Sequence, residues 1–557
     1  MNLIERRIGL VFAAFVLLFG IVIARAAWVQ GLYGGSLSAE AQSQQTETVV
    51  VPGQRGSILD RAGKELAVSE DAATVFATPY QVEEPSAAAR KLAPVLDRSE
   101  SEILEALAEP DTGFAYLARK VDLPTADEVA SLDIHGIGLL PDSRRIYPQG
   151  ELAGQVIGTV GVDNQGLSGL EAAQEELLHG SDGEREVVRD ALGDELERDT
   201  VVGAEAGAEL RLTLDASLQA RTEDVLAGIG RAYEPDGATA VVMDPRTSEV
   251  LAMANWPAVD PGDPDGTDPD WLQNLASGFT YEPGSTFKAF TVGGALEEGM
   301  VTPKTMFDLP PTIQVADRVI EESHPRGYVS LTVSDILAQS SNVGAVTIGL
   351  ELEDTYGAGT FDEWVRRFGF GAPTGIDYPG EEQGIVIPPD EYSGSTMGNL
   401  PLGQGLSVTP LQMAAGYAAI ASDGVLRPPR LIVEQDGEAV APPEGKRVVS
   451  PQTAEKLREM LEGVLEAGGT AEAVTVPGYT LAGKTGTAQK VVDGTYSETE
   501  FVASFVGFAP AEDPQLLVTI VVDNPKGDYY GATVAAPGFG EIAKFALPYL
   551  GIPPDQG

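Results

Sequence analysis

Glu282-Pro283-Gly284-Ser285-Thr286-Phe287-Lys288 places a serine three residues before a lysine, directly after a Pro-Gly break. If a helix begins at this break, positions i and i+3 share one face, so Ser285 and Lys288 meet. A serine hydroxyl becomes an effective nucleophile when a nearby base removes its proton. A lysine amine can be that base when burial or a neighbouring cation lowers its pKa from about 10.4. Ser-x-x-Lys alone is weak, since roughly a couple of chance matches are expected at this length.

The composition narrows the choice of base. The 557 residues include no cysteine, which excludes disulfides, thiolate metal sites and a cysteine nucleophile. Only three histidines occur, and none is close to Ser285 in sequence: His135, His179 and His324. Folding could still bring one of them into a Ser–His–Asp triad. Their scarcity nevertheless favours lysine as the base.

The chain is strongly acidic, with 36 basic and 84 acidic residues and a net charge of −48. A surface of this sign repels nucleic acid, so we expect no nucleic-acid partner. A heavily solvated surface is the simplest interpretation. Adaptation to high salt or to high temperature is the alternative, and charge alone does not choose between them.

One apolar run near the start predicts a membrane anchor. Residues 8–24 are apolar, and extension to Trp28 gives about the 20 residues that cross a bilayer. Arg6 and Arg7 precede the run, which predicts a cytoplasmic N-terminus. Ala24-Arg25-Ala26 resembles a signal-peptide cleavage site, but the run is longer than the usual 7–15 residue signal core. We therefore favour an uncleaved single-pass anchor, and either interpretation places the rest of the chain outside the cytoplasm.

The remainder divides into two modules joined near residue 210. Leu210–Leu214 predicts a strand, and Asp215 is the expected N-cap of the helix that follows it. Further strands are expected at 238–243, 249–255, 479–490, 501–508 and 516–523, with a hairpin loop at 244–248. Helices are expected between them at 410–422 and 451–467. Strands at both ends of a module, with helices inserted, predict an α+β domain whose terminal strands share one sheet.

The segment from Asp260 to Asp270 is rich in Asp, Pro and Gly. Asp263-x-Asp265-Gly266 is a fragment of a calcium-loop pattern, but the expected glutamate and spacing are missing. Acidic Pro- and Gly-rich runs are usually solvated loops. We expect neither a metal ion nor a cofactor.

Two later motifs supply partners for the serine–lysine pair. Ser340-Ser341-Asn342 offers a hydroxyl and an amide, and Lys484-Thr485-Gly486-Thr487 offers a lysine, two hydroxyls and a glycine on an expected strand. Each alone is common in caps, loops or strand ends. The ordered set Ser-x-x-Lys, Ser-x-Asn, Lys-Thr-Gly recurs in serine enzymes that react with penicillin.

With these motifs the chain resembles the class B penicillin-binding proteins, which are peptidoglycan D,D-transpeptidases. The resemblance extends over nearly the whole length, through residues 55–63, 145–148, 166–171 and 405–412. It implies an α+β transpeptidase domain, with a five-stranded antiparallel sheet flanked by helices, on an elongated N-terminal pedestal with one transmembrane helix. The expected segments are a cytoplasmic tail 1–7, an anchor 8–28, a dimerisation-type pedestal 29–209, a connector 210–232 and a transpeptidase domain 233–557.

The resemblance also implies a mechanism. Ser285 attacks the carbonyl between the two terminal D-alanines of a stem peptide, Lys288 accepts its proton, and Ser340 relays a proton to the departing D-alanine. The resulting acyl group passes to an amine of a neighbouring stem, and β-lactams acylate the same serine. Backbone N–H groups of Ser285 and Thr487 stabilise the oxyanion.

The substrate-binding residues implied by the resemblance are Asn342, Lys484, Thr485, Gly486 and Thr487. Asn342 contacts the substrate amide and orients Lys288. The charge of Lys484 helps to keep Lys288 neutral. Lys484 and the two threonines hold the terminal carboxylate, and Gly486 leaves room for substrate along the strand.

The expected partners are lipid II-derived stem peptides, β-lactams, a membrane glycan polymerase of the SEDS family and divisome proteins. Glu282 and the segment 405–412 look more like the septal subgroup, with an elongation-type role as the alternative. A D,D-carboxypeptidase stays open, although the pedestal argues against it. A β-lactamase lacks support because no Glu-x-x-x-Asn lies between the second and third motifs. A β-lactam sensor needs a cytoplasmic domain, and only about seven residues precede the anchor.

Overall fold

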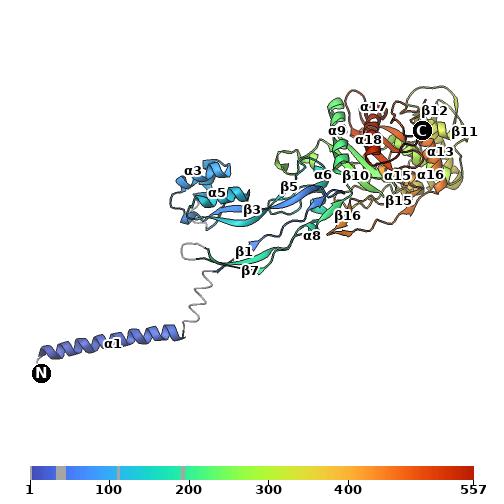
Figure 1. Ribbon diagram of the computed structural model, residues 1–557. Coiled ribbons are helices and arrows are strands. Elements are labelled where there is room, and N and C mark those ends of the chain that lie inside the picture. Colours follow the sequence, from blue (N-terminus) through green and yellow to red (C-terminus); the bar gives the residue numbers. More distant parts are fainter. Residues whose placement is uncertain (1–2, 33–45, 109–112, 190–194, 557) are drawn as a thin grey trace. The chain divides into compact units, whose positions relative to one another are not determined.

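The computed structural model describes residues 3–32, 46–108, 113–189 and 195–556, which form two compact units (Figure 1). The first unit contains residues up to 54, 70–144 and 180–206, and the second contains 55–69, 145–179 and 207–557. Outside the described residues lie 1–2 of the expected tail, 33–45, 109–112 and 190–194 of the expected pedestal, and 557. The domain boundaries expected from the sequence stay predictions.

The first unit begins with α1 (Leu3–Leu32). Within it, Arg6–Gln30 is the one helix among the described residues that is long and apolar enough to cross a membrane, with a mean hydropathy of 2.6. This confirms the expected single N-terminal span in outline. A three-stranded antiparallel sheet and three helices follow, at β1 (Thr46–Val51), β6 (Gly183–Arg189), β7 (Glu195–Val202), α3 (Pro85–Leu96), α4 (Glu100–Leu107) and α5 (Leu123–Ser131).

A long strand, β3 (Glu65–Ala77), contributes to both units. Its later residues pair with β4 (Ala115–Asp122) and β5 (Ile137–Ile146), and α3, α4 and α5 bury their apolar faces over this part of the first unit. Its first residues pair with β2 (Ile58–Leu59) in the second unit. β2 is followed in the sheet by β8 (Leu210–Leu212), β16 (Ile432–Gln435) and β17 (Glu438–Ala439).

A five-stranded antiparallel sheet is the centre of the second unit. Its order is β10 (Glu249–Trp256), β9 (Gly237–Asp244), β21 (Leu516–Asp523), β20 (Thr495–Ala509) and β19 (Ala482–Val492). β9 pairs directly with β21, so strands from the two ends of the module meet in one sheet. The expected α+β class, the hairpin loop at 244–248 and the five-stranded sheet are confirmed.

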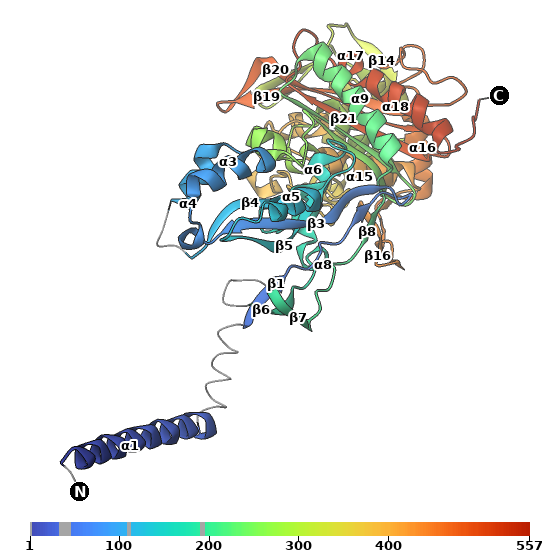
Figure 2. The same cartoon turned by 60° about the vertical axis from the view of Figure 1, so that its left-hand side comes forward.

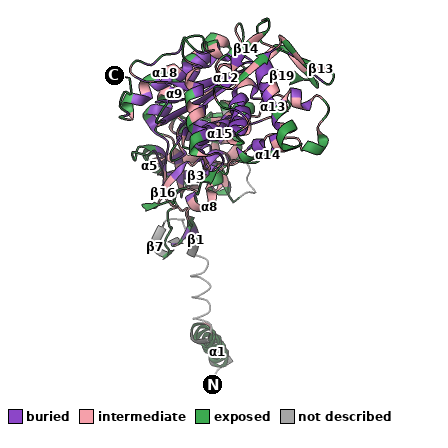
Figure 3. Cartoon of the chain, turned by 90° about the vertical axis from the view of Figure 1, so that its right-hand side faces the viewer, coloured by how far each residue is buried: buried purple, intermediate pink, exposed green. Residues whose placement is uncertain are grey.

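Helices cover both faces of this sheet because its strands alternate their apolar side chains between two cores. Over one face lie α9 (Ala216–Tyr233), α17 (Gly531–Val534) and α18 (Ala536–Tyr549), as Figure 2 shows for α9 and α18. On the other face, α15 (Pro410–Ala421) is buried along its whole length, and purple residues surround it in Figure 3. α11 (Lys288–Glu297), α13 (Asn342–Tyr356) and α16 (Pro451–Glu462) pack with α15 in the same core.

Local sequence signals set several of these boundaries. Asp215 caps α9 as expected, since its carboxylate accepts hydrogen bonds from Ser217 N and Leu218 N. Thr409 and Gln412 form a capping box that begins α15.

The shorter elements of the second unit are α6 (Gly154–Ile157), α7 (Gly169–Ala173), α8 (Glu175–Leu178), α10 (Leu275–Gly278), β11 (Met306–Leu309), β12 (Thr312–Val315), β13 (Arg318–Glu321), β14 (Val329–Thr332), α12 (Val333–Ala338), α14 (Thr360–Arg367), β15 (Val425–Leu426) and β18 (Lys446–Arg447).

A buried ion cluster in the second unit joins two of the segments that carry the family resemblance. Glu171 has no exposed surface, and its carboxylate pairs with Arg55 and, at 2.7 Å, with Nε of Arg145. Arg55 also pairs with Glu175 at 2.7 Å and donates to Asn164 O at 3.1 Å. These contacts fix segments 55–69 and 145–179 to one another.

We expect Glu171→Ala to lower the free energy of unfolding by about 3–5 kcal/mol, because it leaves the buried Arg145 guanidinium without its carboxylate and Arg55 with only the partly exposed Glu175. The shift in urea midpoint, followed by tryptophan fluorescence, measures this change. The control is Glu541→Ala, which removes the exposed partner of Arg221 and should change stability by less than about 1 kcal/mol. Equal effects of the two variants would contradict a structural role for the buried cluster.

Candidate active site

Ser285 lies on a tight turn rather than inside an α-helix. Residues Gly284–Phe287 form a 3₁₀ turn that leads into α11, and positions three apart are eclipsed in this geometry. Gly284 has a φ of 53°, a conformation that favours glycine, and its N–H donates to Gly403 O at 2.9 Å. The Tyr417 hydroxyl donates to Thr286 O at 2.7 Å. The turn is thus held from both sides, with Ser285 half-buried and Lys288 buried beneath it.

Lys288 is 1% exposed and makes three contacts with the Ser340–Asn342 segment. Its Nζ donates to Ser340 O at 2.7 Å and Asn342 Oδ1 at 2.6 Å, and it lies 3.2 Å from Ser340 Oγ. Among the described contacts there is no direct bond from Nζ to the Ser285 hydroxyl. The structure therefore brings the first two motifs together around one amine.

The buried amine is easily deprotonated. Burial lowers the pKa of Lys288 to about 7, while the Glu322 carboxylate opposes this shift and the Arg326 guanidinium adds to it. Burial, followed by repulsion from Lys288, holds the pKa of Lys484 well below its usual range. From the sequence, the charge of Lys484 is expected to help keep Lys288 neutral. In the structure, desolvation is the main cause at Lys288, and the repulsion between the two amines lowers the pKa of Lys484.

The corner that carries the second motif has an unusual backbone. Ser340 has a φ of 58°, which is uncommon for a residue other than glycine. Residues with such backbone angles are often found at functional sites. Ser341 then caps α13 and accepts a hydrogen bond from Gly344 N at 2.9 Å. Asn342 is the first residue of α13, so its amide lies beside Lys288. The sharp corner exposes both Ser340 O and Ser340 Oγ to the lysine.

The third motif lies on β19, the edge strand of the sheet. Lys484 is fully buried, and the Thr485 hydroxyl lies 3.0 Å from the Thr470 hydroxyl. Thr487 Oγ1 accepts a hydrogen bond from Gly531 N at 3.0 Å. An edge strand offers unpaired backbone groups to an extended peptide. The strand can therefore bind a substrate chain along its free side.

Close packing explains why position 486 has no side chain. A Cβ there would come within 2.3 Å of Ser504 Oγ and 2.9 Å of Thr286 Cγ2. These atoms belong to the neighbouring strand and to the turn beside Ser285. Gly486 therefore allows β19 to pack closely against the nucleophile turn, and its expected part in leaving room for substrate stays a prediction.

Sequence reasoning missed four supporting residues: Glu322, Arg326, Tyr417 and Thr470. Tyr417 and Thr470 act on the backbone of the turn and on Thr485, from elements far away in sequence. Glu322 and Arg326 lie in an ordinary polar loop between β13 and β14. No spacing rule links these positions to the motifs, so only the fold reveals them.

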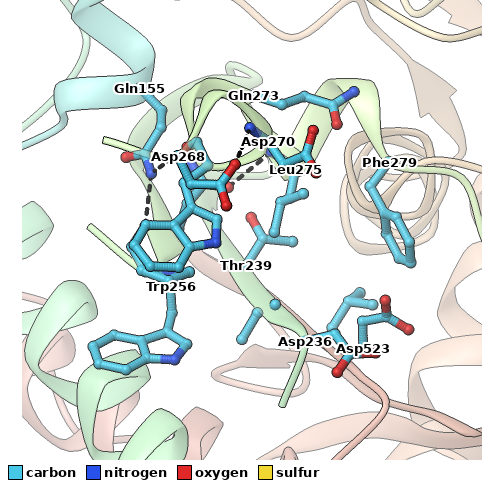
Figure 4. A pocket seen from close by; sticks show the side chains of 16 residues that line it. Gln155, Asp236, Thr239, Trp256, Asp268, Asp270, Gln273, Leu275, Phe279 and Asp523 are labelled. Atoms are coloured by element: carbon cyan, nitrogen blue, oxygen red, sulfur yellow. Dashed lines mark hydrogen bonds between the residues drawn. The ribbon is translucent and has the colours of Figure 1, made fainter. Parts of the chain in front are cut away.

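Cavities occur on both edges of the sheet. One of about 420 Å³ lies beside β19 and the residues that precede the nucleophile turn, and it is lined by Glu282, Gly405, Ser407 and Gln489, among others. Another, of about 210 Å³, lies at the opposite edge beside β9 and β10 and is shown in Figure 4, with Trp256, Asp236 and Asp523. It also takes Asp268 and Asp270 from the acidic loop. Within the described part of the chain, no group of three or more His, Asp or Glu side chains could hold a metal ion.

Comparisons with known proteins agree with this geometry. The family model for the penicillin-binding protein transpeptidase domain matches residues 238–544, and the model for the penicillin-binding protein dimerisation domain matches 50–212. The chain is 37% identical to stage V sporulation protein D of Bacillus subtilis, over 97% of this chain and 86% of that protein. It is 33% identical to peptidoglycan D,D-transpeptidase FtsI of Escherichia coli, over 100% and 93%. The crystal structure of penicillin-binding protein 3 of Mycobacterium tuberculosis with aztreonam matches with 31% identity and a TM-score of 0.71, over 90% and 98%.

Proposed function

The chain belongs to the class B penicillin-binding proteins, and on this basis we propose that Ser285 is the nucleophile of its D,D-transpeptidase reaction. The protein is a serine-type peptidoglycan transpeptidase that binds stem peptides and β-lactams. The observation that carries the residue assignment is the buried Lys288 amine, held by Ser340 and Asn342 below the Ser285 turn. A pKa of about 7 lets this amine both accept and return a proton near neutral pH.

The proposed acylation step balances its protons through Lys288. Ser285 Oγ bonds to the carbonyl carbon of the penultimate D-alanine as its proton moves to Lys288 Nζ. The C–N bond then breaks, and the leaving amine of the terminal D-alanine takes that proton back by way of Ser340 Oγ, which is 3.2 Å from Nζ. Backbone N–H groups of Ser285 and Thr487 stabilise the negative oxygen in between.

Deacylation reverses these roles. An amine of a neighbouring stem attacks the ester carbon, gives its proton to Lys288, and forms the cross-linking amide. Ser285 leaves as the alkoxide and recovers a proton. Attack by water instead would give hydrolysis, so the outcome depends on which nucleophile reaches the ester.

We propose that Lys484, Thr485 and Thr487 hold the terminal carboxylate of the stem. An arriving carboxylate favours the charged form of Lys484 and so raises its pKa. Protonation of Lys484 then accompanies substrate binding. Two neighbouring ammonium charges disfavour each other, so Lys288 is kept neutral in the complex, as its role as base requires.

The cellular role follows the relatives. Similarity to FtsI and to stage V sporulation protein D supports septal cell-wall synthesis. We propose a SEDS-family glycan polymerase and divisome proteins as partners, with a role in elongation as the alternative. Arg6 and Arg7 before the apolar helix support a cytoplasmic N-terminus and an extracytoplasmic catalytic domain. A fluorescent fusion that decorates the side wall rather than the septum would overturn the septal assignment.

The full-length protein, reconstituted with a glycan polymerase and lipid II, should form cross-linked dimers of stem peptides with release of D-alanine. Chromatography of muramidase-digested product measures both. Ampicillin-treated protein is the control and should give uncross-linked glycan only. Release of D-alanine with shortened stems and no dimers would replace the transpeptidase with a D,D-carboxypeptidase.

A further inference from the structure

Glu322 binds the backbone at the start of α13 although it belongs to another element. Its side chain is 6% exposed, in the loop between β13 and β14. The carboxylate accepts hydrogen bonds from Asn342 N at 2.7 Å, Val343 N at 3.2 Å and the Ser341 hydroxyl at 2.7 Å. A carboxylate at this position accepts hydrogen bonds from the first N–H groups of the helix and interacts favourably with the helix dipole. Glu322 thus acts as an N-terminal cap supplied from outside the helix.

Arg326 completes the arrangement. It forms an ion pair with Glu322, four residues earlier, and donates to the Ser341 hydroxyl at 2.6 Å. Ser341 therefore links both members of the pair to the corner that carries Ser340 and Asn342. The same loop is tied to Asn342 a second time, because Asn342 Nδ2 donates to Glu321 O at 2.8 Å.

Two of the acceptors of the Lys288 amine belong to this corner. Ser340 O and Asn342 Oδ1 lie 2.7 and 2.6 Å from Nζ. A shift of the corner would move both at once. The charged groups that act on Lys288 are Glu322 and Arg326 from this loop, with Lys484 facing it from β19, while α13 contributes only the neutral Asn342. The two charges of the pair act on the amine in opposite directions.

We propose that Glu322 and Arg326 are positioning residues, which hold the Ser340–Asn342 corner and, through their opposite charges, keep Lys288 ready to accept the Ser285 proton. The inference rests on the proposed role of Lys288 as base. It assigns a function to a loop that carries none of the three motifs. It also explains why a partly buried ion pair lies beside a lysine that must be neutral to accept a proton, since a lone charge of either sign would shift the pKa of the amine.

The test is the pH dependence of acylation of the full-length protein by a fluorescent penicillin, measured from roughly pH 5.5 to pH 9. The wild-type rate should rise with pH as Lys288 loses its proton, with a midpoint near 7. Arg326→Gln leaves the carboxylate alone beside the amine, so the midpoint should move up by about one pH unit. Glu322→Gln leaves the guanidinium alone, so the midpoint should move down by a similar amount.

The corner gives a second readout in the same experiment. Glu322→Gln should also lower the plateau rate at high pH by about tenfold, because both carboxylate oxygens accept hydrogen bonds from the corner and the amide replaces one of them with an NH₂ group that cannot accept. Glu322→Asp, which keeps the charge, should restore the midpoint. The double variant Glu322→Gln/Arg326→Gln should return the midpoint to near the wild-type value while the plateau stays low. A merely structural pair would lower the plateau and leave every midpoint in place.

Glu541→Gln is the matched control, since it removes one charge of a surface pair on α18 and should change neither the midpoint nor the plateau. Midpoints that coincide with the wild type in both single variants, or that move in the same direction, would overturn the inference. If the pH-dependent rise of the acylation rate were the same in the wild type and in Lys288→Ala, the role of Lys288 as base would be overturned instead. The two failures are therefore distinguishable.

Discussion

Ser285→Ala should abolish covalent labelling by fluorescent penicillin. The β-lactam forms its stable ester with the serine oxygen, and alanine has no atom to replace it. The turn itself should persist, because it is held by Gly284 N to Gly403 O and by the Tyr417 hydroxyl to Thr286 O, neither of which uses the Ser285 side chain. Labelling is read on a denaturing gel after incubation with excess penicillin.

A matched control separates loss of the nucleophile from loss of the fold. Ser422 is also half-buried in the second unit, and its hydroxyl donates to Val425 O. Ser422→Ala should therefore label at close to the wild-type rate. Persistent labelling of Ser285→Ala would falsify the nucleophile assignment, while loss of labelling in both variants would point to a folding defect.

The sequence predicted the architecture well because strong local signals coincide with it. The strands at 238–243 and 516–523 are apolar on both faces and lie inside the sheet, where burial on both sides requires such composition, and the strand at 249–255 is an edge strand that is buried as well. The predicted end of one helix was less accurate. The expected helix at 451–467 ends at Glu462.

The site was predicted only as far as its motifs. The order of Ser285, Asn342 and Lys484 along the chain predicts the type of reaction. It does not predict what lowers the pKa of Lys288. Desolvation depends on what packs above the amine, and the opposing charges come from a loop with no distinctive sequence. Gly486 shows the same limit, because the atoms that exclude a side chain there lie on β20 and on the nucleophile turn.

Lys288→Ala should fold and yet be acylated by penicillin about 10²–10⁴-fold more slowly, the usual contribution of a general base. The remaining rate should also lose its rise near pH 7, since the group that titrates there is gone. Folding should survive because the substitution removes a buried amine rather than leaving an unpaired charge. Lys288→Met, which fills most of the same volume, controls for the cavity and should be as slow. Stopped-flow fluorescence gives the rates, and circular dichroism checks the fold.

Another hydroxyl-x-x-lysine spacing in the chain provides the comparison that isolates the base. Thr453 and Lys456 have the same separation on α16, where Lys456 is only half-buried and no motif partner surrounds it. Lys456→Ala should leave both the rate and its pH profile unchanged. If Lys288→Ala were acylated at a near-normal rate with the limb near pH 7 intact, the proton of Ser285 must go elsewhere. The contacts of Lys288 with Ser340 and Asn342 would then serve packing alone, and the buried corner would have no catalytic reason to hold an amine.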